Sequence, residues 1–264
     1  MIGQVALPVA VGLPIGLQLG ATGTGGAVLA VPALVYLAGV PVKEAAAMSL
    51  VIVGASAWLG MWEYSRLGLV RPKAAVAFSG TGSIGSWLGA YGHELVRGEM
   101  LLIGFGIMLL LARYLMHRHS RTAQTESEMS CAVRFSRSCW LKLAALGLAV
   151  GLLNGFFGVG GGFMIVPALA LFAGFAAREA VGTSLCIIAI ISLGGLARHL
   201  EAGVLNGPLL LLVLLGSAIG MLLGARLGQM VSPPTMGRVT ASITVVIAVT
   251  LLAINTAKVL GMSQ

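Results

Sequence analysis

Long apolar segments without any charged residue alternate with short charged segments along the whole chain. Four segments hold 24, 19, 18 and 18 consecutive residues that include no Asp, Glu, Lys or Arg, and these are residues 202–225, 239–257, 180–197 and 45–62. A helix of about 20 apolar residues spans the hydrocarbon core of a bilayer. The pattern therefore predicts several membrane-spanning helices.

Composition supports the same interpretation. The 264 residues are 58% hydrophobic and 9% charged, and their mean hydropathy is +1.00. In soluble domains about a quarter of the residues are charged. Residues 2–19 have the length of a signal peptide, but the chain has no Lys or Arg before Lys43, so the basic region that precedes such a segment is missing. We expect this segment to be the first membrane helix.

Comparison of the chain with itself reveals two similar halves. Residues 12–50 align with residues 147–185 without a gap, and 18 of the 39 positions are identical. The identical positions include the pairs Gly16/Gly151, Gly20/Gly155, Gly23/Gly158, Gly25/Gly160, Gly26/Gly161 and Pro32/Pro167. The predicted fold is an all-α polytopic membrane protein built from two repeats.

Each half divides into about five apolar segments, so the repeats have inverted topology. The expected limits are 1–116 for the first repeat, 117–140 for a polar and basic cytoplasmic linker, and 141–264 for the second repeat. With this linker inside, 12 Lys and Arg residues fall on the cytoplasmic side and 4 outside. Inverted repeats are typical of secondary transporters. The same charge count results whether the first two segments of each half cross the membrane or re-enter, and we favour shortened helices that meet inside it.

A glycine-rich helix break lies near the start of each half, at residues 20–26 and 155–162. Dense glycine interrupts helices, and irregular backbone at membrane depth needs protein, water or substrate to satisfy its polar groups. Helix N-termini favour anions, so we expect the two breaks to form one anion site near mid-depth. For the glycines that lead into each break we favour close helix packing instead, and these are Gly12, Gly16, Gly20, Gly147, Gly151 and Gly155.

The candidate substrate-binding residues are the glycines of the breaks and the polar side chains near them. They are Gln18, Thr22, Gly23, Thr24, Gly25, Gly26, Ser49, Asn154, Gly158, Gly160, Gly161, Gly162, Thr183 and Ser184. Hydroxyls in helices often bond their own backbone, which is the alternative for Ser49, Thr183 and Ser184. Glu44 and Glu179 are candidate proton-coupling carboxylates, although we favour interfacial charges at helix starts.

Other function classes find little support. The three cysteines have no metal-site spacing, and none of the four histidines stands in a catalytic or metal-binding motif. We expect no enzyme activity, no metal and no cofactor. The net charge of +8 comes from residues between apolar segments, which indicates membrane topology rather than nucleic-acid binding.

The glycine motifs resemble those of the sulfite exporter TauE/SafE family, also called the toluene sulfonate uptake permease family. The resemblance rests on the segment from Gly147 to Pro167 and on its first-half copy from Gly16 to Pro32, and it covers nearly the whole chain. It implies a permease of the bacterial cytoplasmic (inner) membrane that transports sulfur-containing anions such as sulfite or organosulfonates. Ala27 stands where the second half has Gly162, so we expect a smaller first anion site.

We therefore expect a secondary transporter for a small sulfur-containing anion, embedded in membrane lipid. Alternating access would follow from one repeat moving against the other around a site between the breaks. A passive anion channel is the main alternative, and a non-transporting membrane scaffold is a third hypothesis.

Overall fold

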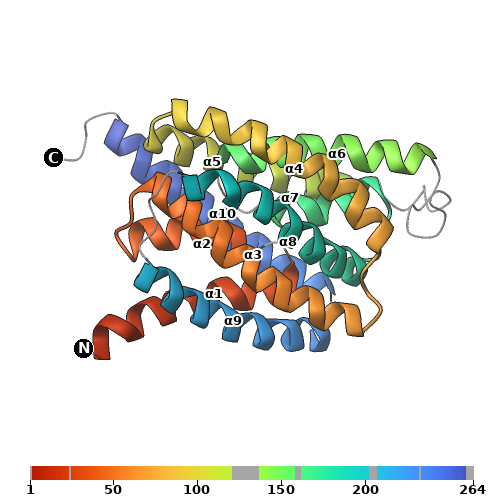
Figure 1. Cartoon of the computed structure of the whole chain (residues 1–264), viewed down its shortest axis with the longest axis horizontal. Coiled ribbons are helices and arrows are strands. Elements are labelled where there is room, and N and C mark those ends of the chain that lie inside the picture. The colour runs from red at the N-terminus through yellow and green to blue at the C-terminus, as the bar shows by residue number, and fades with distance from the viewer. Residues whose placement is uncertain are drawn as a thin grey trace.

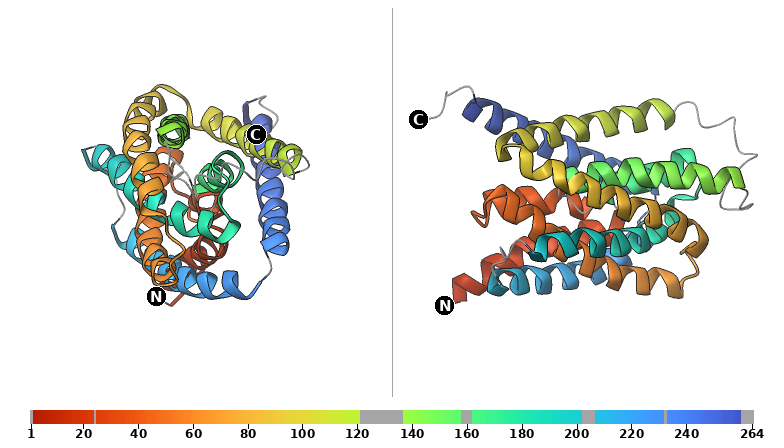
Figure 2. Two further views of the ribbon diagram at one scale, coloured as in Figure 1. Left: turned by 90° about the vertical axis from the view of Figure 1, so that its right-hand side faces the viewer. Right: turned by 45° about the horizontal axis from the view of Figure 1, so that its top comes forward.

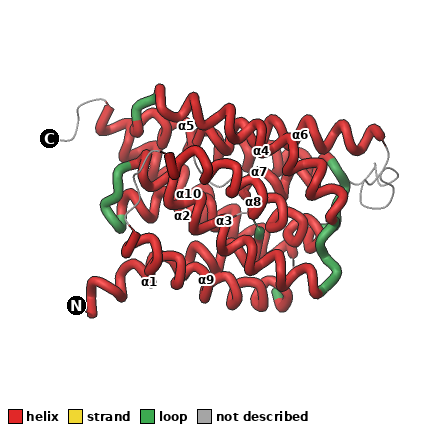
Figure 3. Tube along the Cα trace, viewed as in Figure 1, coloured by secondary structure: helices red, strands yellow, loops and turns green. Residues whose placement is uncertain are grey.

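The computed structural model describes residues 2–23, 25–120, 137–157, 162–201, 207–231 and 233–259. These residues form helices joined by short turns, without a β-strand among them (Figure 3). The helices are α1 (Ile2–Thr22), α2 (Gly25–Tyr36), α3 (Val42–Arg66), α4 (Pro72–Leu95), α5 (Gly98–Ser120), α6 (Arg137–Phe157), α7 (Gly162–Pro167), the π-helical turn η1 (Ala168–Phe172), α8 (Ala177–Glu201), α9 (Gly207–Met230) and α10 (Pro233–Val259). The all-helical class is confirmed.

The helices run side by side along the long axis of the molecule (Figure 1), and Figure 2 shows the bundle nearly end-on. Helix α1 begins and α10 ends at one end of the bundle, whereas α6 begins at the opposite end. Within the described residues four helical segments are long and apolar enough to cross a membrane, and these are Val42–Arg66, Arg137–Phe157, Gly207–Met230 and Arg238–Thr256. The prediction of several membrane-spanning helices is confirmed at this level.

Helix α9 shows how an apolar helix presents two different faces. Its small residues face inward, and Gly216, Ser217, Gly220 and Gly224 are all buried. Its large side chains point outward, with Leu211, Leu215, Ile219 and Leu222 between 48% and 61% exposed. In a bilayer this outer face contacts lipid, while the small residues allow a neighbouring helix to approach closely.

Helix bounds recur with the same offset that aligns the two halves of the sequence. Under this alignment the bounds of α1, α3 and α4 coincide with the bounds of α6, α8 and α9, and the start of α5 coincides with the start of α10. Backbone detail recurs too, because Gly39 and Gly174 have φ angles of 68° and 69°. Just after them the Val40 amide donates to the Leu34 carbonyl at 3.1 Å, and the Phe175 amide donates to the Leu169 carbonyl at 3.2 Å.

Two very close helix contacts join the halves of the chain. Helix α1 packs on α9 and α6 packs on α4, in both cases through glycine. A Cβ atom added to Gly16 would overlap the carbonyl oxygen of Ser217, and one added to Gly151 would overlap that of Gly82. Helices can approach this closely only where a side chain is absent. The predicted packing role of these glycines is confirmed, with partners in the opposite half.

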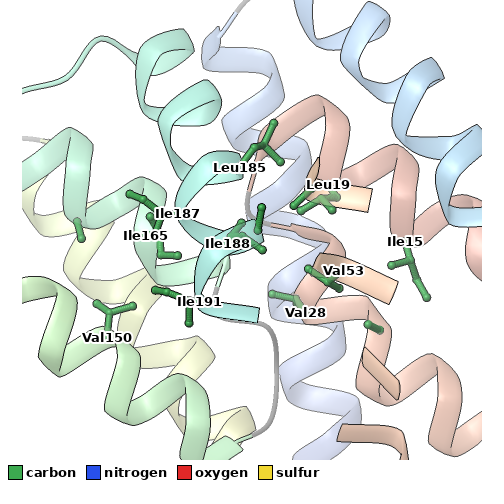
Figure 4. Close-up of a cluster of buried hydrophobic side chains, with 14 of the residues drawn as sticks. Ile15, Leu19, Val28, Val53, Val150, Ile165, Leu185, Ile187, Ile188 and Ile191 are labelled. Atoms are coloured by element: carbon green, nitrogen blue, oxygen red, sulfur yellow. The ribbon is translucent and has the colours of Figure 1, made fainter. Parts of the chain in front are cut away.

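Helix α8 lies in the centre of the hydrophobic core (Figure 4). Its residues Ile187, Ile188 and Ile191 are fully buried among side chains from both halves, including Val53 and Val150. Burial of each such side chain contributes about 1.5–3 kcal/mol in a soluble reference state. Through this core α8 packs together with both glycine-packed helix pairs, α1 with α9 and α6 with α4.

Helices extend further toward the linker than the sequence boundaries suggest. Helix α5 continues to Ser120 and α6 begins at Arg137, whereas the sequence places the linker limits at residues 117 and 140. Residues 121–136 lie outside the described part of the chain.

Candidate functional site

The first helix break separates α1 from α2 and reverses the direction of the chain. Helix α1 ends at Thr22, and Gly23 adopts a φ angle of +67°, which L side chains rarely adopt. Helix α2 begins at Gly25 and folds back along α1. The two helices are so close that a Cβ atom on Gly26 would lie 2.5 Å from the Cβ of Leu19. Thr24 lies outside the described residues.

Hydroxyl groups from two other helices bond the carbonyls of this break. The Tyr64 hydroxyl in α3 donates to the Gly20 carbonyl at 3.0 Å. The Ser184 hydroxyl in α8 lies 3.3 Å from the Gly23 carbonyl and 2.7 Å from the Val181 carbonyl. Carbonyls at a helix C-terminus lack helical partners, and burial makes that loss costly. Sequence reasoning missed Tyr64, which stands between Glu63 and Ser65 just after an apolar segment, and its residue type alone gave no signal.

At the second break, α6 ends at Phe157 and α7 begins at Gly162. Gly158, Gly160 and Gly161 lie outside the described residues, so their expected role stays a prediction. Helix α7 has six residues, includes Pro167, and continues into η1. The wider turn begins directly after Pro167, which lacks an N–H donor, whereas α2 continues as an α-helix past the corresponding Pro32.

The helix ends that lead into the two breaks lie toward opposite ends of the bundle. Gly23 contacts Val181 and Ser184 in the first two turns of α8. Phe156, near the end of α6, would contact a Cβ atom on Gly92 in the last turn of α4 at 2.8 Å. The first turns of α8 and the last turn of α4 are at opposite ends (Figure 1). The ends of α1 and α6 therefore lie apart, whereas the helices that follow the breaks, α2 and α7, contact each other. The expected single anion site between the breaks stays a prediction.

A buried amide side chain lies about one turn before each break. Gln18 in α1 and Asn154 in α6 are 5% and 3% exposed. Neither the amide nitrogen nor the carbonyl oxygen of either side chain has a hydrogen-bond partner among the described residues. Leaving a buried polar group unsatisfied costs about 1–3 kcal/mol, so native proteins rarely do so without a reason. A polar ligand or water would relieve this cost.

The candidate hydroxyls bond nearby backbone instead. The Thr22 hydroxyl donates to the Gln18 carbonyl at 2.8 Å, and the Ser49 hydroxyl donates to the Ala46 carbonyl at 2.8 Å. The Thr183 hydroxyl accepts from the Arg71 amide at 3.1 Å, just before α4 begins. The structure thus brings Ser184 to the first break and places Thr183 at the start of α4.

Both candidate coupling carboxylates lie in the first turn of a helix, Glu44 in α3 and Glu179 in α8. Glu179 accepts a hydrogen bond from the Arg71 guanidinium at 2.5 Å in a partly exposed ion pair. Next to it, the Arg178 guanidinium donates to the Gln229 carbonyl at 3.0 Å. The geometry at Glu179 is that of an interfacial ion pair between α8 and the α3–α4 connection.

Two buried serines that the sequence did not single out also lack partners. Ser86 in α4 is fully buried and Ser192 in α8 is 3% exposed, and neither hydroxyl has a hydrogen-bond partner among the described residues. Serine is too common in membrane helices to attract attention by its presence alone.

Known proteins resemble this chain over nearly its whole length. Residues 8–251 match the family model described as sulfite exporter TauE/SafE. A "probable membrane transporter protein" of Xylella fastidiosa (strain 9a5c) is 31% identical over 240 residues, which cover 89% of this chain and 90% of the relative. No solved structure matches the chain significantly.

More distant relatives have similar descriptions. The probable membrane transporter protein YdhB of Bacillus subtilis is 25% identical over 80% of this chain and 85% of its own length. The probable membrane transporter protein MJ0441 of Methanocaldococcus jannaschii is 25% identical over 90% and 91%. The chain therefore belongs to the sulfite exporter TauE/SafE family, a family of multi-pass membrane transporters and not of enzymes.

Proposed function

We propose that this protein is a secondary transporter for sulfur-containing anions such as sulfite or organosulfonates. The observation that carries the proposal is the pair of buried amides, Gln18 and Asn154, one beside each helix break, which have no hydrogen-bond partner among the described residues. Amide N–H groups can bind the oxygens of a small anion without a cationic side chain, which would be costly to bury in the membrane. The family description supports sulfite as the class of substrate.

Inverted repeats are part of this proposal. Two observations support an inverted arrangement. Helix bounds recur between the two halves, and α1 and α6 begin at opposite ends of the bundle. An odd number of crossings per half produces this arrangement. The basic linker would then face the cytoplasm in a bacterial-type inner membrane.

Close glycine contacts bear on how such a transporter would move. Motion of one half of the chain against the other would separate α1 from α9 and α6 from α4, where the backbones touch at Gly16 and Gly151. We therefore propose that these two helix pairs remain intact during alternating access. The movement would occur between the pairs and the central helices α2, α3, α7 and α8.

Thermal stability of the purified protein tests the binding step of this function. Ligands that bind only the folded state stabilise it, by about 2.7 kcal/mol at 100 times Kd. Sulfite and methanesulfonate are expected to raise the unfolding temperature in a concentration-dependent manner. Choline chloride at equal ionic strength is the control, and stabilisation by choline alone would contradict the proposal.

A passive anion channel is the second candidate, because unsatisfied polar groups can also line a conducting pore. The two functions differ in the concentration dependence of flux. A carrier saturates and shows competition between sulfite and sulfonates, whereas a channel gives flux that rises steadily with concentration.

A further inference from the structure

The two halves place different side chains at corresponding positions beside their breaks. In the alignment of the halves, Leu19 corresponds to Asn154 and Met221 corresponds to Ser86. The backbone surroundings match, because a Cβ atom on Gly20 would overlap the Met221 carbonyl oxygen, and one on Gly155 would overlap that of Ser86. An apolar pair in one half is therefore replaced by a polar pair in the other.

Large side chains fill the space beside the first break. The Met221 side chain reaches from α9 to α3, where its terminal methyl group occupies the position next to Gly60, and the Leu185 side chain lies beside it. Leu19 is fully buried against Gly26. Apolar groups thus occupy the positions that correspond to Asn154 and Ser86.

The corresponding positions in the second half carry an amide and a hydroxyl. The Ser86 side chain is shorter than that of Met221, and its hydroxyl is fully buried without a partner among the described residues. Asn154 continues the buried stripe of Leu143 and Val150 on α6, opposite the exposed Leu148 and Leu152. Polar groups therefore stand where the first half has apolar side chains.

Asn154 and Ser86 also approach each other through the backbone. Asn154 directly precedes Gly155, and the Cα of Ser86 lies 2.8 Å from where a Cβ on Gly155 would be. The backbones of α6 and α4 are therefore in contact next to Asn154, and both side chains are buried.

We infer that the substrate binds beside the second break, between Asn154 and Ser86, and that the first break, where Leu19 and Met221 occupy the corresponding positions, is its structural counterpart. This inference rests on the proposed transport function. It agrees with the hydrogen bonds at the first break. There the Tyr64 hydroxyl bonds the Gly20 carbonyl, and the Ser184 hydroxyl bonds the Gly23 carbonyl.

The chemistry of the two side chains narrows the ligand. The Asn154 amide offers two donors and one acceptor, and a serine hydroxyl can both donate and accept. All of these groups are unpartnered among the described residues, including the acceptor oxygen of Asn154. The matching ligand is a monoanion whose oxygens accept hydrogen bonds and which carries an O–H or N–H donor of its own. Hydrogen sulfite and aminomethanesulfonate have this chemistry, and methanesulfonate lacks the donor.

Exchanging residues between corresponding positions tests the inference on the purified full-length protein. Asn154→Leu and Ser86→Met introduce the residues that the first half already has in matching backbone surroundings. Calorimetric titration with sulfite at mildly acidic pH, where hydrogen sulfite predominates, should show at least tenfold weaker binding for each variant. The unfolding temperature without ligand should stay the same or rise, because a buried unpartnered polar group has been removed.

Three further measurements make the outcome decisive. The double variant Ser56→Ala/Ser217→Ala removes a buried pair of hydroxyls, from α3 and α9, that are bonded at 2.8 Å. This variant should keep wild-type sulfite binding. Ser86→Ala removes the hydroxyl without adding a larger side chain. It should weaken sulfite binding, and it tests the inference even where Ser86→Met fails to fold. Wild-type protein should bind aminomethanesulfonate more tightly than methanesulfonate.

Unchanged sulfite binding in Asn154→Leu and Ser86→Ala would overturn the inference while leaving the transport function intact. Loss of binding in Gln18→Leu with retention in Asn154→Leu would likewise overturn it and place the site at the first break. Failure of the wild-type protein to bind any sulfur anion would instead remove the proposed function itself.

Discussion

The hydroxyl group of Tyr64 in α3 donates a hydrogen bond to the carbonyl oxygen of Gly20 in α1, over a distance of 3.0 Å. Gly20 is in the last turn of α1, where carbonyls lose their helical partners, and Tyr64 is 3% exposed. This contact stabilises a helix end inside the bundle and fixes the position of the first break relative to α3.

Replacement of Tyr64 by Phe should destabilise the protein by about 1 kcal/mol, because the Gly20 carbonyl loses its donor and remains buried. Thermal unfolding in detergent measures the effect. Tyr114→Phe, at a position 59% exposed, is the matched control and should leave the unfolding temperature unchanged. Equal stability of the two variants would show that water or another group satisfies Gly20.

Close packing at Gly16 and Gly151 predicts strong destabilisation by a single methyl group. An alanine Cβ would overlap the Ser217 carbonyl oxygen in one case and that of Gly82 in the other. Each helix pair must separate to accept it, at a cost of about 1–3 kcal/mol or more. Folded yield and thermal unfolding of Gly16→Ala and Gly151→Ala provide the measurement.

Gly80→Ala is the control for these glycine substitutions, because no atom outside its own stretch of helix lies within 4 Å of the added Cβ. The higher helix propensity of alanine should make this variant as stable as the wild type or slightly more stable. A similar loss of stability in all three variants would contradict the packing explanation.

The hydrogen bond between Ser56 and Ser217 should contribute modestly to stability. The two hydroxyl oxygens are 2.8 Å apart and buried, whereas the corresponding positions in the other half hold Ile191 and Gly82 in an apolar contact. Hydrogen bonds between membrane helices contribute about 0.6 kcal/mol on average. A double-mutant cycle of Ser56→Ala and Ser217→Ala should yield a coupling energy of this size, and zero coupling would argue against a formed bond.

The ion pair of Glu179 with Arg71 predicts a small and salt-dependent effect for Glu179→Gln. Both side chains are partly exposed, so the pair should contribute no more than about 1 kcal/mol. Sulfite uptake into proteoliposomes should keep its dependence on a proton gradient, if it has one, in this variant. Loss of that dependence in a folded variant would support the proton-coupling role of Glu179 instead.

Much of the fold follows from the order of residues along the chain. The offset between the halves, read from Gly16, Gly20, Pro32 and their counterparts, anticipates the bounds of α6, α8 and α9 from those of α1, α3 and α4. Helix bounds can be predicted in this way because helices begin and end near glycine, proline or charged residues that border the apolar segments.

Pairing between helices could not be predicted in the same way. Glycine at positions 12, 16 and 20 indicates a close neighbour but does not say which helix it is, and the partner α9 lies in the opposite half of the chain. The hydrogen bond of Thr183 with the Arg71 amide and that of Tyr64 with Gly20 depend on the same long-range arrangement. Similarly, that Asn154 and Ser86 have no hydrogen-bond partner in the described part of the chain depends on their surroundings and not on their residue type.

Counterflow of radiolabelled sulfite in proteoliposomes tests the central claim most directly. Vesicles that contain the wild-type protein and are preloaded with unlabelled sulfite should accumulate label transiently, with a rate that saturates and is reduced by external aminomethanesulfonate. Vesicles with Asn154→Leu should accumulate little label. Absence of counterflow in wild-type vesicles, or influx that rises linearly with sulfite concentration and is equal in both proteins, would contradict a carrier with its binding site at Asn154.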